Sequence, residues 1–63
     1  MTRAKLTITM DNAAFEGENC GPELARILRE AAGEAENLTY IGKRATMVLR
    51  DINGNRVGCL TVT

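Results

Sequence analysis

The sequence predicts an α+β fold: a single β-α-β-β domain over residues 1–63, with one helix packed on a three-stranded, mainly antiparallel sheet. Three observations predict it. Apolar and polar residues alternate over residues 3–10, apolar residues recur every three or four positions over residues 21–37, and an Asn-Gly pair separates two further alternating runs. These patterns are typical of a half-buried strand, an amphipathic helix and a β-hairpin, in that order.

The length and composition of the chain fit a small folded domain. A chain of 63 residues buries only about 60% of the surface that its unfolded form exposes, so regular packing, a disulfide, a metal or a second copy usually supports it. Its apolar fraction of 44% and charged fraction of 25% are ordinary for globular proteins. No apolar run approaches the roughly 20 residues that cross a bilayer, and the start does not resemble a signal peptide. We therefore expect a cytoplasmic protein without a membrane segment.

The first strand is expected over residues 3–10, followed by a loop. Its inward-facing residues are Ala4, Leu6, Ile8 and Met10. The next stretch carries two glycines and two asparagines, which predicts a loop with one helical turn at residues 12–15, started by Asp11. Phe15 is the only Phe in the chain and is expected to fill one end of the core.

The helix is expected to begin with Gly21 as N-cap and Pro22 as its first residue, and to end near Asn37. Glu23 in the first turn complements the helix dipole. The buried stripe consists of Leu24, Ile27, Leu28, Ala31 and Ala35. After the helix, the predicted packing residues are Leu38, Tyr40 and Ile41, and a second strand follows over residues 43–50.

The stretch "DINGNR", residues 51–56, fits either a calcium loop or a hairpin turn. An EF-hand loop needs glycine at its sixth position and an acid at its twelfth, but here Arg56 and Val62 stand at those positions. Asn-Gly between two strand-like runs instead indicates a tight turn, because both residues tolerate positive φ. The sequence therefore predicts a hairpin and no metal site.

The turn sets which residues of the hairpin face the core. A two-residue turn at Asn53-Gly54 pairs Leu49 with Gly58, and the same register pairs Met47 with Leu60 and Ala45 with Val62. A type I turn with a bulge at Gly54 would shift the register by one and bury Val57 and Cys59. The first register is preferred because it buries the larger side chains.

The preferred register leaves Val48, Val57 and Cys59 on the outer sheet face, where they form a candidate dimer face. The expected strand order is 1-3-2, with the last strand in the centre. Because neither sheet edge is protected by proline, pairing with a second chain is an expected route to stability.

Charge is segregated along a chain whose net charge is zero. Residues 11–36 carry seven acids against two arginines, a net of −5, and the remainder carries +5. The two halves attract one another in one interpretation. In the other, an acidic surface is offered to a basic partner. The candidate partner-binding residues are Glu16, Glu18, Glu23, Glu30 and Glu34.

The residue types argue against catalysis and against a cofactor. The chain has no His and no Ser, so it lacks the commonest general base and the serine nucleophile. Cys20 and Cys59 match no metal-binding spacing and are expected to be reduced. A basic sheet face with Arg3, Lys5, Arg44 and Arg50 could meet phosphates, but it offers no aromatic rings for stacking bases, so direct nucleic-acid binding is not favoured.

The segments "LTITMDNAAFE", "ELARILRE" and "LRDINGNRVG" together resemble small proteins of unassigned function that are encoded in bacteriophages, prophages and plasmids. The resemblance covers most of the chain and carries over no functional residues. By analogy with anti-CRISPR proteins, it implies a non-catalytic protein-binding module that inhibits a host defence complex in the bacterial cytoplasm. The alternatives are a structural homodimer and an accessory nucleic-acid-binding protein that uses the basic face.

Overall fold

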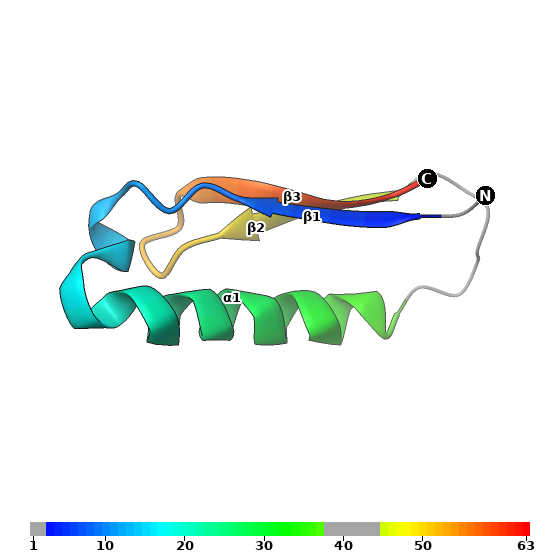
Figure 1. The fold of residues 1–63 in the computed structure, drawn as a ribbon. Helices are drawn as coiled ribbons and strands as arrows, with labels where there is room; N and C mark the ends of the chain where they lie inside the picture. The colour runs from blue at the N-terminus through cyan, green and yellow to red at the C-terminus, as the bar shows by residue number, and fades with distance from the viewer. Residues whose placement is uncertain (1–2, 38–44) are drawn as a thin grey trace.

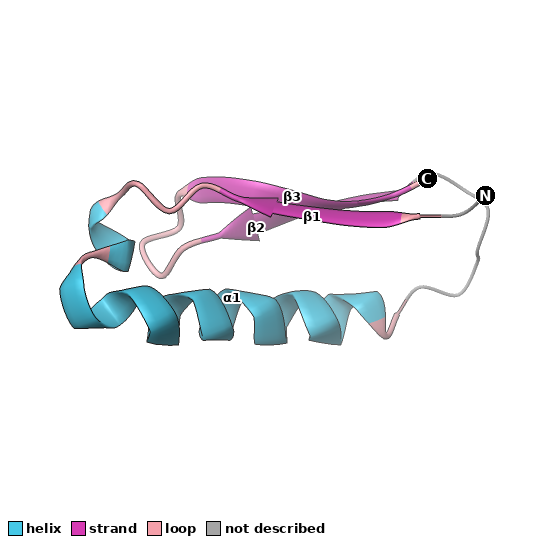
Figure 2. Cartoon of the chain, viewed as in Figure 1, coloured by secondary structure: helices cyan, strands magenta, loops and turns pink. Residues whose placement is uncertain are grey.

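The computed structural model describes residues 3–37 and 45–63 and confirms the α+β fold (Figures 1 and 2). One helix lies along one face of a three-stranded sheet. The predicted packing of Leu38, Tyr40 and Ile41 and the strand start at residues 43–44 lie outside the described residues. The elements in chain order are β1 (Ala4–Ile8), the 3-10 turns η1 (Ala13–Phe15) and η2 (Gly17–Asn19), α1 (Cys20–Ala35), β2 (Ala45–Arg50) and β3 (Arg56–Val62).

The sheet has the predicted strand order, β1-β3-β2, and both pairs are antiparallel. The strand register is also the preferred one: Leu49 pairs with Gly58 and Met47 pairs with Leu60. On the other side of β3, Leu6 pairs with Leu60. Since paired residues share a face, Leu6, Met47 and Leu60 point to the same side, the one that α1 covers.

The predicted two-residue turn at Asn53-Gly54 is wrong. The N–H of Gly54 donates to the carbonyl of Asp51 at 3.0 Å, so Ile52 and Asn53 are the central residues of the turn. Gly54 follows them with φ +86°. In the described ranges, only glycines have positive φ. The ladder then shifts by one between Leu49 and Arg50. A turn with a glycine bulge therefore coexists with the preferred register, because the shift is confined to the end of the hairpin.

The bulge corrects the predicted position of Val57. This residue was expected on the outer face, but its side chain is only 7% exposed and belongs to the core. The extra residue at the bulge breaks the alternation of β3, so Val57 turns inward while Gly58, next in the chain, still pairs with Leu49.

The core lies between the helix, the first 3-10 turn and the parts of β2 and β3 next to the hairpin turn. Phe15 is buried as predicted, and Ile27 is completely buried. Leu6 and Leu28 keep 38% and 43% of their surface exposed although both were expected to face inward. The helix therefore closes only part of the sheet face. The core residues are Ala14, Phe15, Ile27, Ala31, Leu49 and Val57, with Ile8 and Met10 packed against them.

The helical segments begin at other residues than expected. Asn12 rather than Asp11 caps η1, because its side chain accepts a hydrogen bond from the N–H of Ala14. Helix α1 begins at Cys20 with Asn19 as N-cap, so Pro22 is its third residue. Proline is tolerated there because the first four N–H groups of a helix have no partner within it. In the described ranges, no helix is long and apolar enough to cross a membrane.

The molecule is elongated. Its extents are 39 × 18 × 17 Å and its radius of gyration is 12.6 Å, against about 10.6 Å for a compact chain of this length. The hairpin turn, both 3-10 turns and the start of α1 gather at one end, at the left of Figure 1. We call residues 12–23 and 51–55 the hairpin end.

Candidate functional site

Two buried carboxylates lie at the hairpin end. Asp51 is 4% exposed and Glu23 is 6% exposed. A buried carboxylate is costly unless its oxygens are hydrogen bonded or paired with a cation. A polar cluster that joins the hairpin turn to η1 and α1 supplies the hydrogen bonds to both carboxylates and a cation to one of them. It consists of Asn12, Glu23, Arg26, Asp51 and Asn55.

Asp51 accepts four hydrogen bonds. Its Oδ1 accepts from the N–H groups of Asn53 at 2.9 Å and Asn55 at 2.8 Å. Its Oδ2 accepts from the amide groups of Asn12 at 2.7 Å and Asn55 at 3.2 Å. Because the oxygens are directed at N–H donors, the "DINGNR" carboxylate acts as the anchor of a turn, and it also ties η1 to the hairpin through Asn12.

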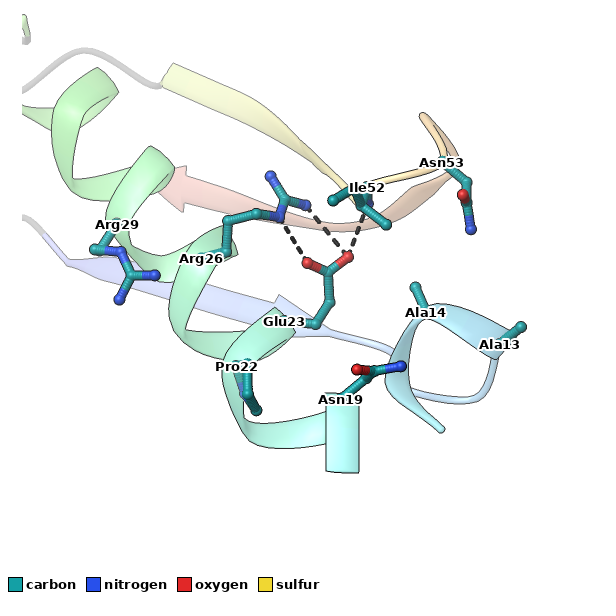
Figure 3. A pocket seen from close by; sticks show the side chains of 9 residues that line it. All are labelled: Ala13, Ala14, Asn19, Pro22, Glu23, Arg26, Arg29, Ile52 and Asn53. Atoms are coloured by element: carbon teal, nitrogen blue, oxygen red, sulfur yellow. Dashed lines mark hydrogen bonds and ion pairs between the residues drawn. The ribbon is translucent and has the colours of Figure 1, made fainter. Parts of the chain in front are cut away.

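Glu23 joins α1 to the same turn. Its Oε2 accepts from the N–H of Ile52 at 2.7 Å, and its Oε1 lies 2.6 Å from Nε of Arg26 (Figure 3). Arg26 also donates to Glu30 at 2.8 Å and to the carbonyl of Arg50 at 3.1 Å. Two side chains of α1 therefore bind the main chain of the hairpin: the Glu23 carboxylate accepts from the N–H of Ile52, and the Arg26 guanidinium donates to the carbonyl of Arg50.

The pKa values of both carboxyls are lowered. The hydrogen bond from Arg26 is the largest influence on the pKa of Glu23, and together with the Ile52 N–H it outweighs the cost of burial. For Asp51, burial on its own would raise the pKa, but the hydrogen bonds from Asn55, Asn12 and Asn53 together lower it. The pKa of Arg26 is raised, chiefly by its hydrogen bond to Glu23. The cluster is thus held in its ionised form, as a structural device requires.

Beside the cluster lies an open groove of about 540 Å³. Figure 3 shows it between η1, the first turns of α1 and the hairpin turn. Ile52 stands on its border and is 70% exposed, the largest exposed fraction among the large apolar side chains in the described ranges. Its main chain is fixed by Glu23. The groove is lined by Ala13, Ala14, Asn19, Pro22, Glu23, Arg26, Arg29, Ile52 and Asn53.

The structure separates the five predicted partner-binding acids. Glu16 and Glu18 are exposed at the hairpin end. Glu23 is buried in the polar cluster, so it offers no surface to a partner. Glu30 is 61% exposed but is paired with Arg26. Glu34 is exposed about 21 Å along α1 from its first residue, so it lies away from Glu16, Glu18 and Glu23 and one helical turn from Glu30.

The predicted dimer face is reduced to two of its three residues. Val48 is 39% exposed and pairs with the half-buried Cys59, so both lie on the outer face of the sheet. Val57 belongs to the core instead. Cys20 and Cys59 are both free thiols in the structure.

Sequence reasoning singled out Glu23 and the "DINGNR" stretch but missed the partners that join them. Asn12 and Asp51 are 39 residues apart, and Ile52 and Glu23 are 29 apart, so no local pattern connects them. One signal was available: an isoleucine between two polar turn residues has no role in a hairpin turn itself. No protein-family model, curated protein or solved structure matches the chain.

Proposed function

We propose that the protein is a non-catalytic protein-binding module that docks through its hairpin end. Its target would be a basic, nucleic-acid-binding complex of the bacterial host, and its action in the host cytoplasm would be the inhibition of a defence system. The observation that carries the docking site is Ile52, an exposed apolar side chain on a turn whose main chain is held from two sides.

An exposed apolar side chain on a fixed turn beside a groove suits protein docking. Ordering a flexible loop on binding costs affinity, and a turn that is already ordered avoids that cost. The Asp51 and Glu23 carboxylates bind the N–H groups of Asn53, Asn55 and Ile52, so the turn is ordered before any partner arrives. The binding energy of an interface is commonly concentrated in a few side chains that are packed tightly into pockets of the partner.

The charges of the hairpin end favour a basic partner. The carboxylates of the polar cluster are buried and are bound by Arg26 and by N–H donors, whereas Glu16 and Glu18 are exposed on η2 and the residue before it. Exposed charges of one sign mainly raise the rate of association with an oppositely charged surface. The resemblance to phage and plasmid proteins supports a host complex as the source of that surface.

The first test uses an apolar-to-charged exchange at the hairpin end. The protein is used to capture its target from the natural host, and binding of the purified target is then compared for Ile52→Asp and Val48→Asp. We expect Ile52→Asp to weaken binding at least tenfold and Val48→Asp, on the outer sheet face, to leave it within twofold. Equal effects of the two exchanges would contradict docking through the hairpin end.

The second test reverses charge. We expect the double variant Glu16→Lys/Glu18→Lys to associate more slowly with the same target and to lose most of the salt dependence of association. Glu34→Lys is the matched control, because it reverses an exposed charge on the far part of α1. A larger effect of Glu34→Lys than of the double variant would place the docking surface elsewhere.

A further inference from the structure

Strand β1 is an open sheet edge with an apolar face that the helix does not cover. In the described part of the chain, β3 is its only neighbour in the sheet. Leu6, at the centre of β1, faces the helix side but is 38% exposed. Such an edge presents unpaired N–H and C=O groups to a further strand.

The hydrogen bonds to β3 show which groups of β1 are free. Arg3 and Thr63 exchange both main-chain hydrogen bonds, at 2.7 and 2.9 Å. In an antiparallel pair these bonds occur at every second residue, so Lys5 and Thr7 also direct their main chain at β3. Ala4, Leu6 and Ile8 therefore direct their N–H and C=O groups outward, and these are the three residues with side chains on the apolar face.

We propose that β1 pairs with β1 of a second copy about a two-fold axis at Leu6. In this register Leu6 opposes Leu6 of the partner, and Ala4 opposes Ile8, so the outward N–H groups of all three residues donate to outward C=O groups of the other copy, and their C=O groups accept in return. Lys5 opposes Thr7, and the two lysines are not placed opposite each other. The result is a continuous six-stranded sheet in which one apolar face runs across the axis.

The other sheet edge is less suited to this pairing. Arg50 lies at the end of β2, and its carbonyl already accepts a hydrogen bond from Arg26. The guanidinium of Arg50 in turn donates to the carbonyl of Gly54 at 3.0 Å. One end of the β2 edge is therefore occupied by the chain's own helix, whereas no helix side chain binds the main chain of β1 in the described ranges.

The helix adds a second apolar element beside β1. Arg26 reaches toward β2, and Leu28 lies about 200° further around α1, on the side away from β2. Because β1 is the strand farthest from β2, Leu28 flanks the space beneath β1. The 43% exposure of Leu28 and the 38% exposure of Leu6 thus belong to the same uncovered region, which a second helix and sheet would close.

The exposed area matches the need of a dimer. A compact monomer of 6.8 kDa exposes about 3,950 Å², whereas this chain exposes 4642 Å². The excess of roughly 700 Å² approaches the ~800 Å² that each partner buries in a standard interface. The elongated chain therefore exposes more surface than a compact chain of its mass, and the excess is close to the area that one partner buries in a standard interface.

Charge exchange at Leu6 tests the two-fold axis. In analytical ultracentrifugation, we expect the wild-type protein to sediment as a dimer. Leu6→Lys and Leu6→Glu are each expected to sediment as monomers, because each places two like charges opposite one another at the axis. Mixing the two variants should restore a dimer, since Lys then opposes Glu. Circular dichroism of each variant alone checks that the monomers are folded.

Val48 provides the matched control, since its 39% exposure equals that of Leu6 within one per cent but it lies on the outer face of β2. Val48→Lys and Val48→Glu should both remain dimeric. A monomeric wild-type protein, a dimer that survives both Leu6 variants, or a dimer broken only by the Val48 variants would each overturn the proposal. A mixture of Leu6 variants that stays monomeric would also overturn it. Because these measurements use no target, they are independent of the docking function proposed above.

Discussion

The side chain of Asp51 holds both the turn that follows it and a segment 39 residues earlier in the chain. Its four hydrogen bonds all come from N–H donors, so an acceptor with two full oxygen atoms is needed at this position. Asparagine has nearly the same shape but replaces one acceptor oxygen by a donor group. The position therefore distinguishes Asp from Asn by chemistry rather than by size.

We expect Asp51→Asn to lower the melting temperature by more than about 5 °C, because a buried NH₂ group would then face other N–H donors. Thermal unfolding followed by circular dichroism measures the change. Asp11→Asn removes the same charge at an exposed position and should leave the melting temperature nearly unchanged. If both variants melt at the same temperature, Asp51 does not anchor the hairpin.

The two buried carboxyls should also make stability depend on acidity. A carboxyl whose pKa is lower in the folded than in the unfolded state contributes stability above its unfolded pKa and loses that contribution as the pH falls through its folded pKa. The ordinary pKa values are 4.5 for Glu23 and 3.8 for Asp51, and both are lowered on folding. The free energy of unfolding should therefore be level near neutrality and fall on acidification below about pH 4.5.

Urea unfolding at a series of pH values measures this dependence. The fall should be shallower in Asp51→Asn, because one of the two linked carboxyls is gone. A wild-type stability that rises between pH 4.5 and pH 3 would contradict the lowered pKa values of Glu23 and Asp51.

At the scale of elements, β1 and β3 approach closely at Gly58. A Cβ added to Gly58 would lie 2.9 Å from Cα of Ile8 and still closer to the carbonyl oxygen of Thr7. Main-chain atoms cannot rotate away as the end of a flexible side chain can. The close approach of β1 to β3 therefore requires glycine at position 58, which also lies beside the bulge of the hairpin.

We expect Gly58→Ala to lower the free energy of unfolding by about 1–3 kcal/mol, because β1 must move away from β3. Gly33→Ala is the control within α1, where an added Cβ meets nothing within 4 Å. This second exchange should raise stability by up to about 1 kcal/mol, since Ala favours a helix. Chemical denaturation measures both, and a neutral Gly58→Ala would contradict the close approach of the two strands.

The elements themselves could be predicted from the sequence, but their ends could not. Alternation located β1, the three-four spacing located α1, and Asn-Gly located the hairpin, because each signal is local and repeats over several residues. The turn geometry and the burial of Val57 depend on a single bulged residue, which leaves no repeating signal. The start of α1 was placed at Pro22 rather than Cys20, because the preceding 3-10 turn has no distinct pattern.

The candidate site was predictable only in part, for a related reason. The polar cluster is built from pairs 29 and 39 residues apart, and the sequence predicts Glu23 to be a surface charge because acids usually are. Glu16 and Glu18 are exposed as expected. The exposure of Ile52 follows from where Asp51 and Glu23 fix the turn, and this depends on the assembled structure.

At the scale of the whole molecule, the proposed dimer should appear in thermal stability. Dimerisation stabilises the folded state by mass action, so the melting temperature should rise with protein concentration. Leu6→Lys should melt at a temperature that does not depend on concentration. Differential scanning calorimetry over a series of dilutions measures both proteins. A wild-type melting temperature that stays constant across the series would contradict a dimer whose formation stabilises the folded state.

The position of β3 between its two neighbours has a consequence for synthesis. Both β1 and β2 precede β3 in the chain, and they bond to β3 rather than to each other. Until residues 56–62 are available, the earlier strands have no sheet to join. Helix α1 can form early, but the sheet can assemble only after the last strand is present, so a chain cut within the hairpin would leave Leu6 and Met47 unshielded from proteases and chaperones.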